Sequence, residues 1–307
     1  MDFTSFFLLP DGRLRAGWRL LLFLVIFLAA AILFHWTASA FFRERTLISQ
    51  TALLAAASVA GLAAVSVATW LMTTLLEHES FWAVGLALGQ QSPREMALGL
   101  AFGSGLVGTI AVAEWAVGAI HFELSGPGGA STLVLIASGT GILAVSATSE
   151  ELLFRGYPFQ RLVEGTGGYM ALAISSIIFG WLHRLNPHST NLSVMNTMLA
   201  GILLSLAYLK TGALWLPIGF HFSWNWTMAL LGLPVSGVDL IRMPWQAVPS
   251  SSQLWLHGGG YGPEGGVVGT LVLTGGIVCL IRMREKTSGQ TPDVSPRAAS
   301  STGPLLP

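Results

Sequence analysis

Three short motifs place polar and ionisable side chains within stretches of apolar sequence. They are Glu150-Glu151-x-x-x-Arg155, Phe179-x-x-x-His183 and His221-x-x-x-Asn225. An ionisable side chain inside a membrane span is costly, so it predicts a functional site. A carboxylate, two imidazoles and an amide can together activate a water molecule and stabilise an oxyanion. Glu150, His183 and His221 are also able to hold Zn²⁺ with one position left open.

The spacing within the first motif separates its two carboxylates. Glu151 and Arg155 are four residues apart, so on a helix they share one face and predict an ion pair. Glu150 points about 100° away from Glu151, because an α-helix has 3.6 residues per turn. It is therefore free to face a cavity, where it can take a proton from water. The alternative is that both glutamates lie among the lipid headgroups.

The histidine motifs allow equally plain interpretations when each is taken alone. His183 lies at the end of an apolar segment, where a histidine is usually an interface residue. His221 and Asn225 are four residues apart and share one helical face, which predicts that this face lies in a bundle interior. Such a pair could also be an ordinary hydrogen-bonding contact between membrane helices.

The composition indicates that these motifs lie in a membrane protein. Of the 307 residues, 52% are hydrophobic and only 10% are charged, compared with about 25% charged residues in soluble domains. The formal net charge is zero, so nothing indicates binding to nucleic acid. The single cysteine, Cys279, excludes an internal disulfide and a cysteine-rich metal site.

Apolar runs predict an all-α bundle of about eight transmembrane helices, because an irregular backbone cannot be satisfied in lipid. The predicted spans are 17–42, 47–76, 96–120, 131–154, 168–182, 193–209, 213–231 and 266–281. With the N-terminus in the cytoplasm, this count leaves four of the fifteen basic residues on the outer side: Arg43, Arg45, Arg184 and Arg242. That bias predicts that both termini are cytoplasmic.

The same count divides the chain into three parts. We expect a cytoplasmic segment at 1–16, a membrane domain at 17–285 whose core is about 131–231, and a disordered tail at 286–307. The stretch 232–265 predicts an outer loop resting on the membrane interface through Trp245 and Trp255.

The three motifs, in this order and on separate spans, resemble the CPBP family of intramembrane peptidases (CaaX proteases and bacteriocin-processing proteins). Gly156 and Gly180 also fit the pattern of that family, and the resemblance covers about 131–231. It implies hydrolysis of a peptide bond in a membrane-associated substrate, either prenylated CaaX-type or bacteriocin-like. The location implied is an integral membrane position, and we expect the cytoplasmic membrane of a bacterium.

The resemblance also implies a role for each motif residue. Glu150 would be the general base acting on a water that His183 also holds. His221 and Asn225 would donate to the oxyanion. Glu151 and Arg155 would orient Glu150 and balance its charge. Zinc held by Glu150, His183 and His221 is implied as well, although activation of water by glutamate alone uses the same residues.

One feature of the predicted spans conflicts with a shared site. Glu150 lies near the inner end of its span, and His183 lies near the outer end of the next. For the two to share a water, either the helix must continue past Arg155, with a kink at Pro158, or the next helix must be displaced.

Other classes fit less well. The chain has no His-Glu-x-x-His and no Gly-x-Ser-x-Gly, and its four aspartates lie outside the predicted spans. A transporter or proton-coupled channel that uses the buried Glu and His residues is the main alternative, and a non-catalytic scaffold is another. Glu114, in the third span, matches no motif, and we expect it to pair with a polar group in the bundle. The partners expected are membrane lipid and a membrane-associated peptide or protein, and no oligomeric state is indicated.

Overall fold

The eight predicted spans all form helices in the computed structural model. The model describes residues 3–42, 50–124, 130–240, 243–250 and 252–283. The main helices are α2 (Ala16–Phe42), α3 (Gln50–Leu71), α4 (Ser92–Ala116), α5 (Ala130–Arg155), α7 (Gly168–Leu182), α8 (Asn191–Thr211), α9 (Trp215–Leu230) and α11 (Val267–Arg282). A short α1 (Phe3–Phe7) precedes them. The predicted tail at 286–307 lies outside the described residues.

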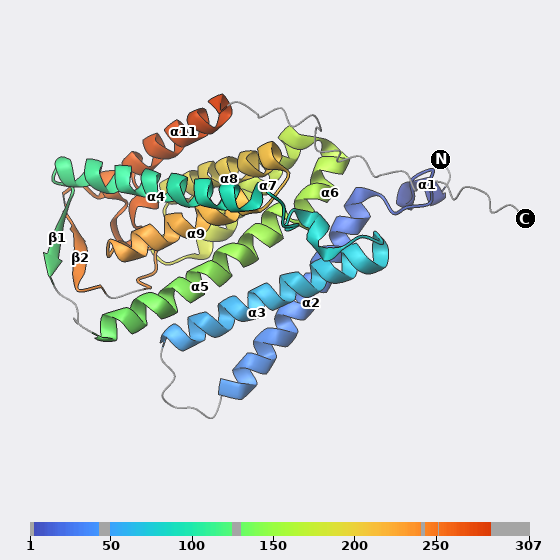
Figure 1. Ribbon diagram of the computed structural model, residues 1–307, viewed down its shortest axis with the longest axis horizontal. Coiled ribbons are helices and arrows are strands. Elements are labelled where there is room, and N and C mark those ends of the chain that lie inside the picture. Colours follow the sequence, from blue (N-terminus) through green and yellow to red (C-terminus); the bar gives the residue numbers. More distant parts are fainter. Residues whose placement is uncertain (1–2, 43–49, 125–129, 241–242, 251, 284–307) are drawn as a thin grey trace, which may run out of the picture.

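The predicted fold class, an all-α membrane bundle, is confirmed. Five helical stretches are long and apolar enough to cross a membrane: Ala16–Ala40, Thr51–Leu76, Ser92–Ala116, Thr132–Thr166 and Asn191–Thr211. The shorter helices α7, α9 and α11 have 15, 16 and 16 residues, less than the about 20 that a full crossing requires. In Figure 1, α5 lies between the α2–α3 pair and the group formed by α4, α8, α9 and α11.

The helical path continues beyond Arg155, which resolves the conflict between the levels of Glu150 and His183. α5 ends at Arg155, and α6 (Tyr157–Thr166) begins after Gly156. The break is at Gly156, two residues before the predicted kink at Pro158. A side chain at Gly156 would collide with the carbonyl oxygen of Leu152. Because α6 carries the chain farther before α7 turns back, Glu150 lies well inside this stretch and the end of α7 reaches its level.

A network of buried charges, which we call the Arg19 cluster, fixes α6 against the first two spans. It consists of Arg19, Glu77, Tyr157, Arg161 and Glu164. Arg19 is 1% exposed and donates to both oxygens of Glu77 at 3.0 Å, and it also pairs with Glu164. Glu77 follows the π-helical turn Met72–Leu76 that ends the second span. The cluster therefore joins elements that the span count assigns to one side of the membrane.

Two glycines in α4 allow α9 to approach closely. A side chain at Gly99 would collide with the backbone of Leu216 and Phe220, and one at Gly103 would collide with Ser223 and Phe220. The Gly-x-x-x-Gly pattern in this helix is thus used for packing. Close contact with α4 fixes the helix that carries His221 and Asn225.

The stretch 232–265 contains more regular structure than the predicted interfacial loop. Strand β2 (Trp245–Pro249) pairs antiparallel with β1 (Ile120–Leu124), with Ile120 opposite Pro249. Helix α10 (Leu254–His257) and the turns Gly259–Tyr261 and Pro263–Gly265 follow. The predicted span 96–120 accordingly ends as a helix at Ala116. No local pattern marked these strands, because each is stabilised by a partner more than 120 positions away.

Candidate active site

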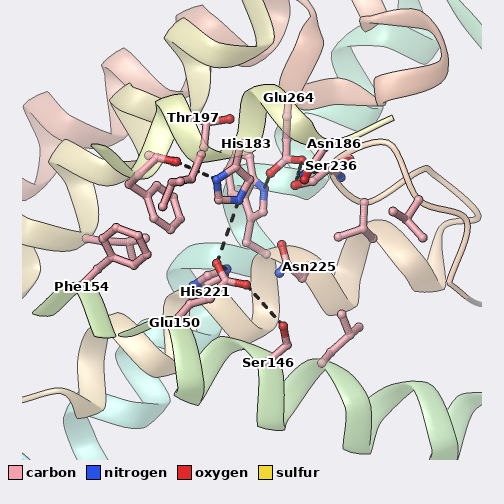
Figure 2. Close-up of a pocket in the computed structure, with 18 of the residues that line it drawn as sticks. Ser146, Glu150, Phe154, His183, Asn186, Thr197, His221, Asn225, Ser236 and Glu264 are labelled. Atoms are coloured by element: carbon pink, nitrogen blue, oxygen red, sulfur yellow. Dashed lines mark hydrogen bonds and ion pairs between the residues drawn. The ribbon is translucent and has the colours of Figure 1, made fainter. Parts of the chain in front are cut away.

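Glu150, His183 and His221 converge from three helices on one point. Oε2 of Glu150 lies 4.0 Å from Nε2 of His183 and 3.9 Å from Nε2 of His221. Figure 2 shows Glu150 pointing from α5 into a cavity, with His183 facing it. Oε1 of Glu150 accepts a hydrogen bond from Ser146 at 3.3 Å, one helical turn earlier. Oε2 is buried and has no hydrogen-bond partner among the described residues.

The second carboxylate of the motif is turned away from the cavity, as its spacing predicts. Glu151 Oε1 accepts from Arg155 at 3.2 Å, and both side chains are fully buried. The predicted ion pair is therefore confirmed, and the alternative in which both glutamates lie among headgroups is wrong for Glu151. Arg155 also donates to the carbonyl of Gly201 at 3.1 Å and to Ser205 at 3.4 Å. Its guanidinium lies over the ring of Phe179, 4.6 Å from the centroid.

The hydrogen bond that Nδ1 makes in each histidine ring determines where the ring carries its proton, and Nε2 is the nitrogen nearer to Glu150. Nδ1 of His183 lies 2.7 Å from the carbonyl oxygen of Phe179, and Nδ1 of His221 lies 2.7 Å from Oε1 of Glu151. A carbonyl and an ion-paired carboxylate only accept hydrogen bonds, so both Nδ1 atoms carry the proton. In a neutral ring, Nε2 is then a free acceptor. The acceptor for the His183 ring is thus the carbonyl of the first residue of its own motif, Phe179, four positions earlier.

Small residues hold α7 in the position that places His183. A side chain at Gly180 would collide with Met198 and the carbonyl of Val194 on α8. Ser175 donates to the carbonyl of Phe154 on α5 at 3.1 Å. These contacts keep α7 close to both α5 and α8.

The converging groups line a cavity of about 350 Å³. Asn225, one helical turn after His221, also lines it, as Figure 2 shows. Its remaining walls are mostly apolar and include Leu54, Leu143, Phe154, Phe179 and Phe220. The structure thus brings Glu150, His183, His221 and Asn225 to one cavity, with Glu151 and Arg155 directly behind it.

Five polar residues that the motifs did not indicate also line this cavity. They are Ser146, Asn186, Thr197, Ser236 and Glu264. Ser146 could have been found, because it lies one helical turn before Glu150. Glu264 and Ser236 belong to the stretch after α9 and carry no local signal. They meet the site only through the fold.

Glu114 does not take part in this site. Its side chain is fully buried on α4, and within the described chain neither carboxylate oxygen has a hydrogen-bond partner. Within the described part of the chain, the expectation that Glu114 pairs with a polar group in the bundle is therefore wrong. The residues that line the cavity do not include it.

The donor set suits zinc in kind but not in spacing. A carboxylate oxygen and two Nε2 atoms, each ring held through Nδ1, are ligands that Zn²⁺ prefers. A tetrahedral ion would bring these atoms to about 3.3 Å from one another, given bonds of about 2.0–2.1 Å. The observed separations are 4.0 and 3.9 Å, and no group of three or more His, Cys, Asp or Glu in the described chain is placed to hold a metal. Binding of zinc would thus require each histidine Nε2 and Oε2 of Glu150 to approach each other by less than 1 Å.

Comparison with known proteins identifies the part of the chain that carries the site. No curated protein and no solved structure matches the chain. Residues 130–227 match the family model described as type II CAAX prenyl endopeptidase Rce1-like. This stretch contains all three motifs, which lie on α5, at the end of α7 and on α9. Residues 130–227 of this integral membrane protein are therefore similar to the Rce1-like type II CAAX prenyl endopeptidases, and the similarity covers the part of the chain that carries the site.

Proposed function

We propose that this protein is an intramembrane endopeptidase that hydrolyses a peptide bond of a membrane-associated substrate. The observation that carries the proposal is the arrangement around Glu150. Its Oε2 is buried, has no hydrogen-bond partner in the described chain and faces two imidazole nitrogens about 4 Å away. A water molecule between these atoms would fill the unmet hydrogen bond, because buried polar groups are normally paired.

Glu150 and His183 are the residues proposed to activate this water. Nε2 of His183 is an acceptor when the ring is neutral, so it can hold one water hydrogen while Oε2 of Glu150 takes the other. As the water oxygen attacks the peptide carbonyl carbon, its proton passes to Glu150. The same carboxyl then gives that proton to the leaving nitrogen as the carbon–nitrogen bond breaks. One water is consumed, and Glu150 returns to its starting state.

His221 and Asn225 are proposed to stabilise the oxyanion. The side-chain amide of Asn225 is a donor in any state. Nε2 of His221 can donate only when the ring is doubly protonated, because Nδ1 already donates to Glu151. In this scheme the Glu151 carboxylate balances the imidazolium, while Arg155 anchors Glu151. Preorganised donors of this kind are usually the largest contribution to such catalysis.

Zinc remains part of the proposal as an alternative way to activate the water. Glu150, His183 and His221 would hold it, and the ion would act as a Lewis acid on the bound water. The two schemes differ in His221, whose Nε2 must be unprotonated to bind a metal and protonated to donate. Cleavage that survives removal of metal and falls at alkaline pH supports the donor scheme. Cleavage that depends on added zinc supports the metal scheme.

The substrate is proposed by class only. The apolar cavity wall suits an extended apolar peptide, and the family assignment favours a lipidated CaaX-type substrate over a bacteriocin-like one. Matched reporters that differ only in the presence of a prenyl group on a C-terminal cysteine separate these possibilities. Equal cleavage of both reporters would contradict a requirement for the lipid.

The proposal is tested with Glu150→Gln in membranes, using a panel of membrane-anchored and lipidated reporter peptides. We expect cleavage to fall by at least about 10³-fold, because the amide can neither accept nor return the proton. Glu123→Gln is the matched control, since this glutamate is 57% exposed on β1 and outside the cavity. Each reporter is assayed with and without a zinc chelator. A Glu150→Gln protein that cleaves as fast as wild type would refute the proposal and favour a transporter or scaffold.

A further inference from the structure

A single segment, residues 233–240, separates the catalytic cavity from a second pocket. We call this segment the strap. Val235, Ser236, Val238 and Leu240 face the catalytic cavity. Leu233, Pro234, Gly237 and Asp239 line the second pocket, whose volume is about 170 Å³. The wall between the two spaces is therefore one chain thick, and the position of the strap sets the shape of the cavity.

Glu264 connects the strap to helix α9. Oε2 of Glu264 accepts from the backbone nitrogen of Ser236 at 2.8 Å and from its hydroxyl at 2.7 Å. Oε1 accepts from the indole nitrogen of Trp224 at 3.0 Å. The carboxylate is only 9% exposed, so these charge-assisted bonds are little weakened by solvent. Trp224 directly precedes Asn225, and Figure 2 shows Glu264 and Ser236 together on the cavity wall.

The backbone of the strap depends on this connection. Val235 and Val238 exchange two backbone hydrogen bonds of 3.0 and 2.9 Å, which makes Ser236 and Gly237 the central residues of a tight turn. Both have positive φ, +47° at Ser236 and +86° at Gly237. Glycine adopts this conformation freely, whereas a serine there is strained. The two bonds from Ser236 to Glu264 offset that strain.

The strap also contacts the segment that follows His183. Asn186, three residues after His183, donates to the carbonyl of Ser236 at 3.2 Å. A side chain at Gly237 would collide with the carbonyl of Pro187. The strap is therefore packed against the segments that carry His183 and Asn225, and Glu264 is the charged group that fixes it there.

We propose that Glu264 is a positioning residue that latches the strap as the substrate-binding wall of the catalytic cavity. This inference rests on the proposed peptidase function and adds a part of the chain outside the matched residues 130–227. Substrate lies against Val235 and Val238, and Glu264 acts through Ser236 and Trp224 without touching the reacting atoms. These hydrogen bonds of Glu264, which we call the latch, affect substrate binding, whereas Glu150 takes part in the hydrolysis itself.

The activity test compares Glu264→Gln with wild type on one reporter. Glutamine keeps the size but presents an N–H group to one of the three donors, so at least one bond is lost. We expect KM to rise about tenfold with kcat changed less than about threefold, since a loosened wall removes substrate binding. A merely structural role would reduce the amount of active enzyme, lowering kcat at unchanged KM. That result would overturn the proposal.

A second variant tests the wall itself. Val238→Phe adds bulk on the cavity side of the strap. We expect cleavage of reporters with a large residue beside the scissile bond to fall at least about tenfold more than cleavage of matched reporters with alanine. Equal loss for both reporters would contradict direct contact between the strap and substrate.

The latch is also measurable without activity, through hydrogen exchange at the backbone amide of Ser236. Because this amide donates to Glu264, Glu264→Ala is expected to speed its exchange at least about tenfold. In the control Glu123→Gln, exchange at Ser236 should match wild type. Unaltered exchange at Ser236 would overturn the latch even if cleavage were normal. If the wild type cleaved no reporter, the proposed function would fail, and with it the role of the strap in substrate binding.

Discussion

Two clusters of buried charged side chains lie on neighbouring parts of the chain, the candidate active site on α5 and the Arg19 cluster on α6, and the carboxylates of the two clusters are paired differently. In the Arg19 cluster every carboxylate oxygen has a partner. Glu77 accepts from Arg19, Tyr157 and Arg161 at 2.7 to 3.0 Å, and Glu164 pairs with Arg19 and Arg161. In the candidate active site one buried oxygen of Glu150 and one of Glu151 have no hydrogen-bond partner in the described chain, and of these two residues only Glu150 lines the cavity.

This difference indicates that the Arg19 cluster stabilises the fold, whereas the candidate active site is able to do chemistry. A buried carboxylate whose oxygens are all paired can hold helices together, but it has no capacity left for a substrate or water. A buried carboxylate oxygen that is left free and faces two imidazoles retains that capacity.

Arg155→Ala is expected to produce the largest effect, because Arg155 supports both structure and site. Its removal leaves the buried Glu151 without its arginine partner and with His221 as its remaining one, which costs about 3–5 kcal/mol of stability. Glu151 would then no longer be held beside His221, so cleavage should also be lost. Thermal unfolding in detergent, together with reporter cleavage by the folded fraction, measures both. A variant as stable as wild type would show that the ion pair is not needed for folding.

Arg19→Ala is expected to affect stability alone. The change leaves Glu77 and Glu164 with fewer partners in a mostly buried place, at a cost of about 2–3 kcal/mol. Cleavage per folded molecule should match wild type, because the cluster does not line the cavity. The same two measurements apply. Reduced cleavage by the folded protein would contradict the claim that the Arg19 cluster contributes to stability alone.

Acid should weaken the Arg19 cluster to a smaller extent. Burial raises the pKa of Glu77, but hydrogen bonds and charges from Tyr157, Arg161 and Arg19 outweigh it, so the pKa lies below its ordinary value. A lowered pKa in the folded state means that Glu77 contributes fully above its unfolded pKa, about 4.3. The contribution is lost as the pH falls through the lower folded value. Unfolding temperatures measured between neutral pH and about pH 3 should therefore drop less in Glu77→Gln than in wild type. Parallel curves would contradict this account.

Local spacing predicted the parts of the molecule that depend on neighbours within one helix. The apolar runs marked all eight helices, and the spacing of Glu151 and Arg155 predicted their ion pair. Continuation of the helix past Arg155 was one of the two predicted ways to bring Glu150 and His183 to one level, but the break at Gly156 was not predicted.

Contacts between residues that are far apart in the chain could not be predicted from the sequence. Arg19 pairs with residues 58 and 145 positions away, and no pattern relates such positions. The same holds for Glu264 and Ser236, which reach the cavity from a glycine-rich stretch after α9. That stretch resembled a loop, since glycine and proline mask the pairing of β2 with β1.

The most direct test compares Glu150→Gln with Glu77→Gln in parallel, measuring reporter cleavage and unfolding temperature for each. We predict that Glu150→Gln loses cleavage but unfolds close to the wild-type temperature, because its Oε2 makes no hydrogen bond to the described chain. Glu77→Gln should cleave normally while folded and unfold at a lower temperature. Wild-type cleavage by Glu150→Gln would contradict the central claim that this free oxygen performs the chemistry.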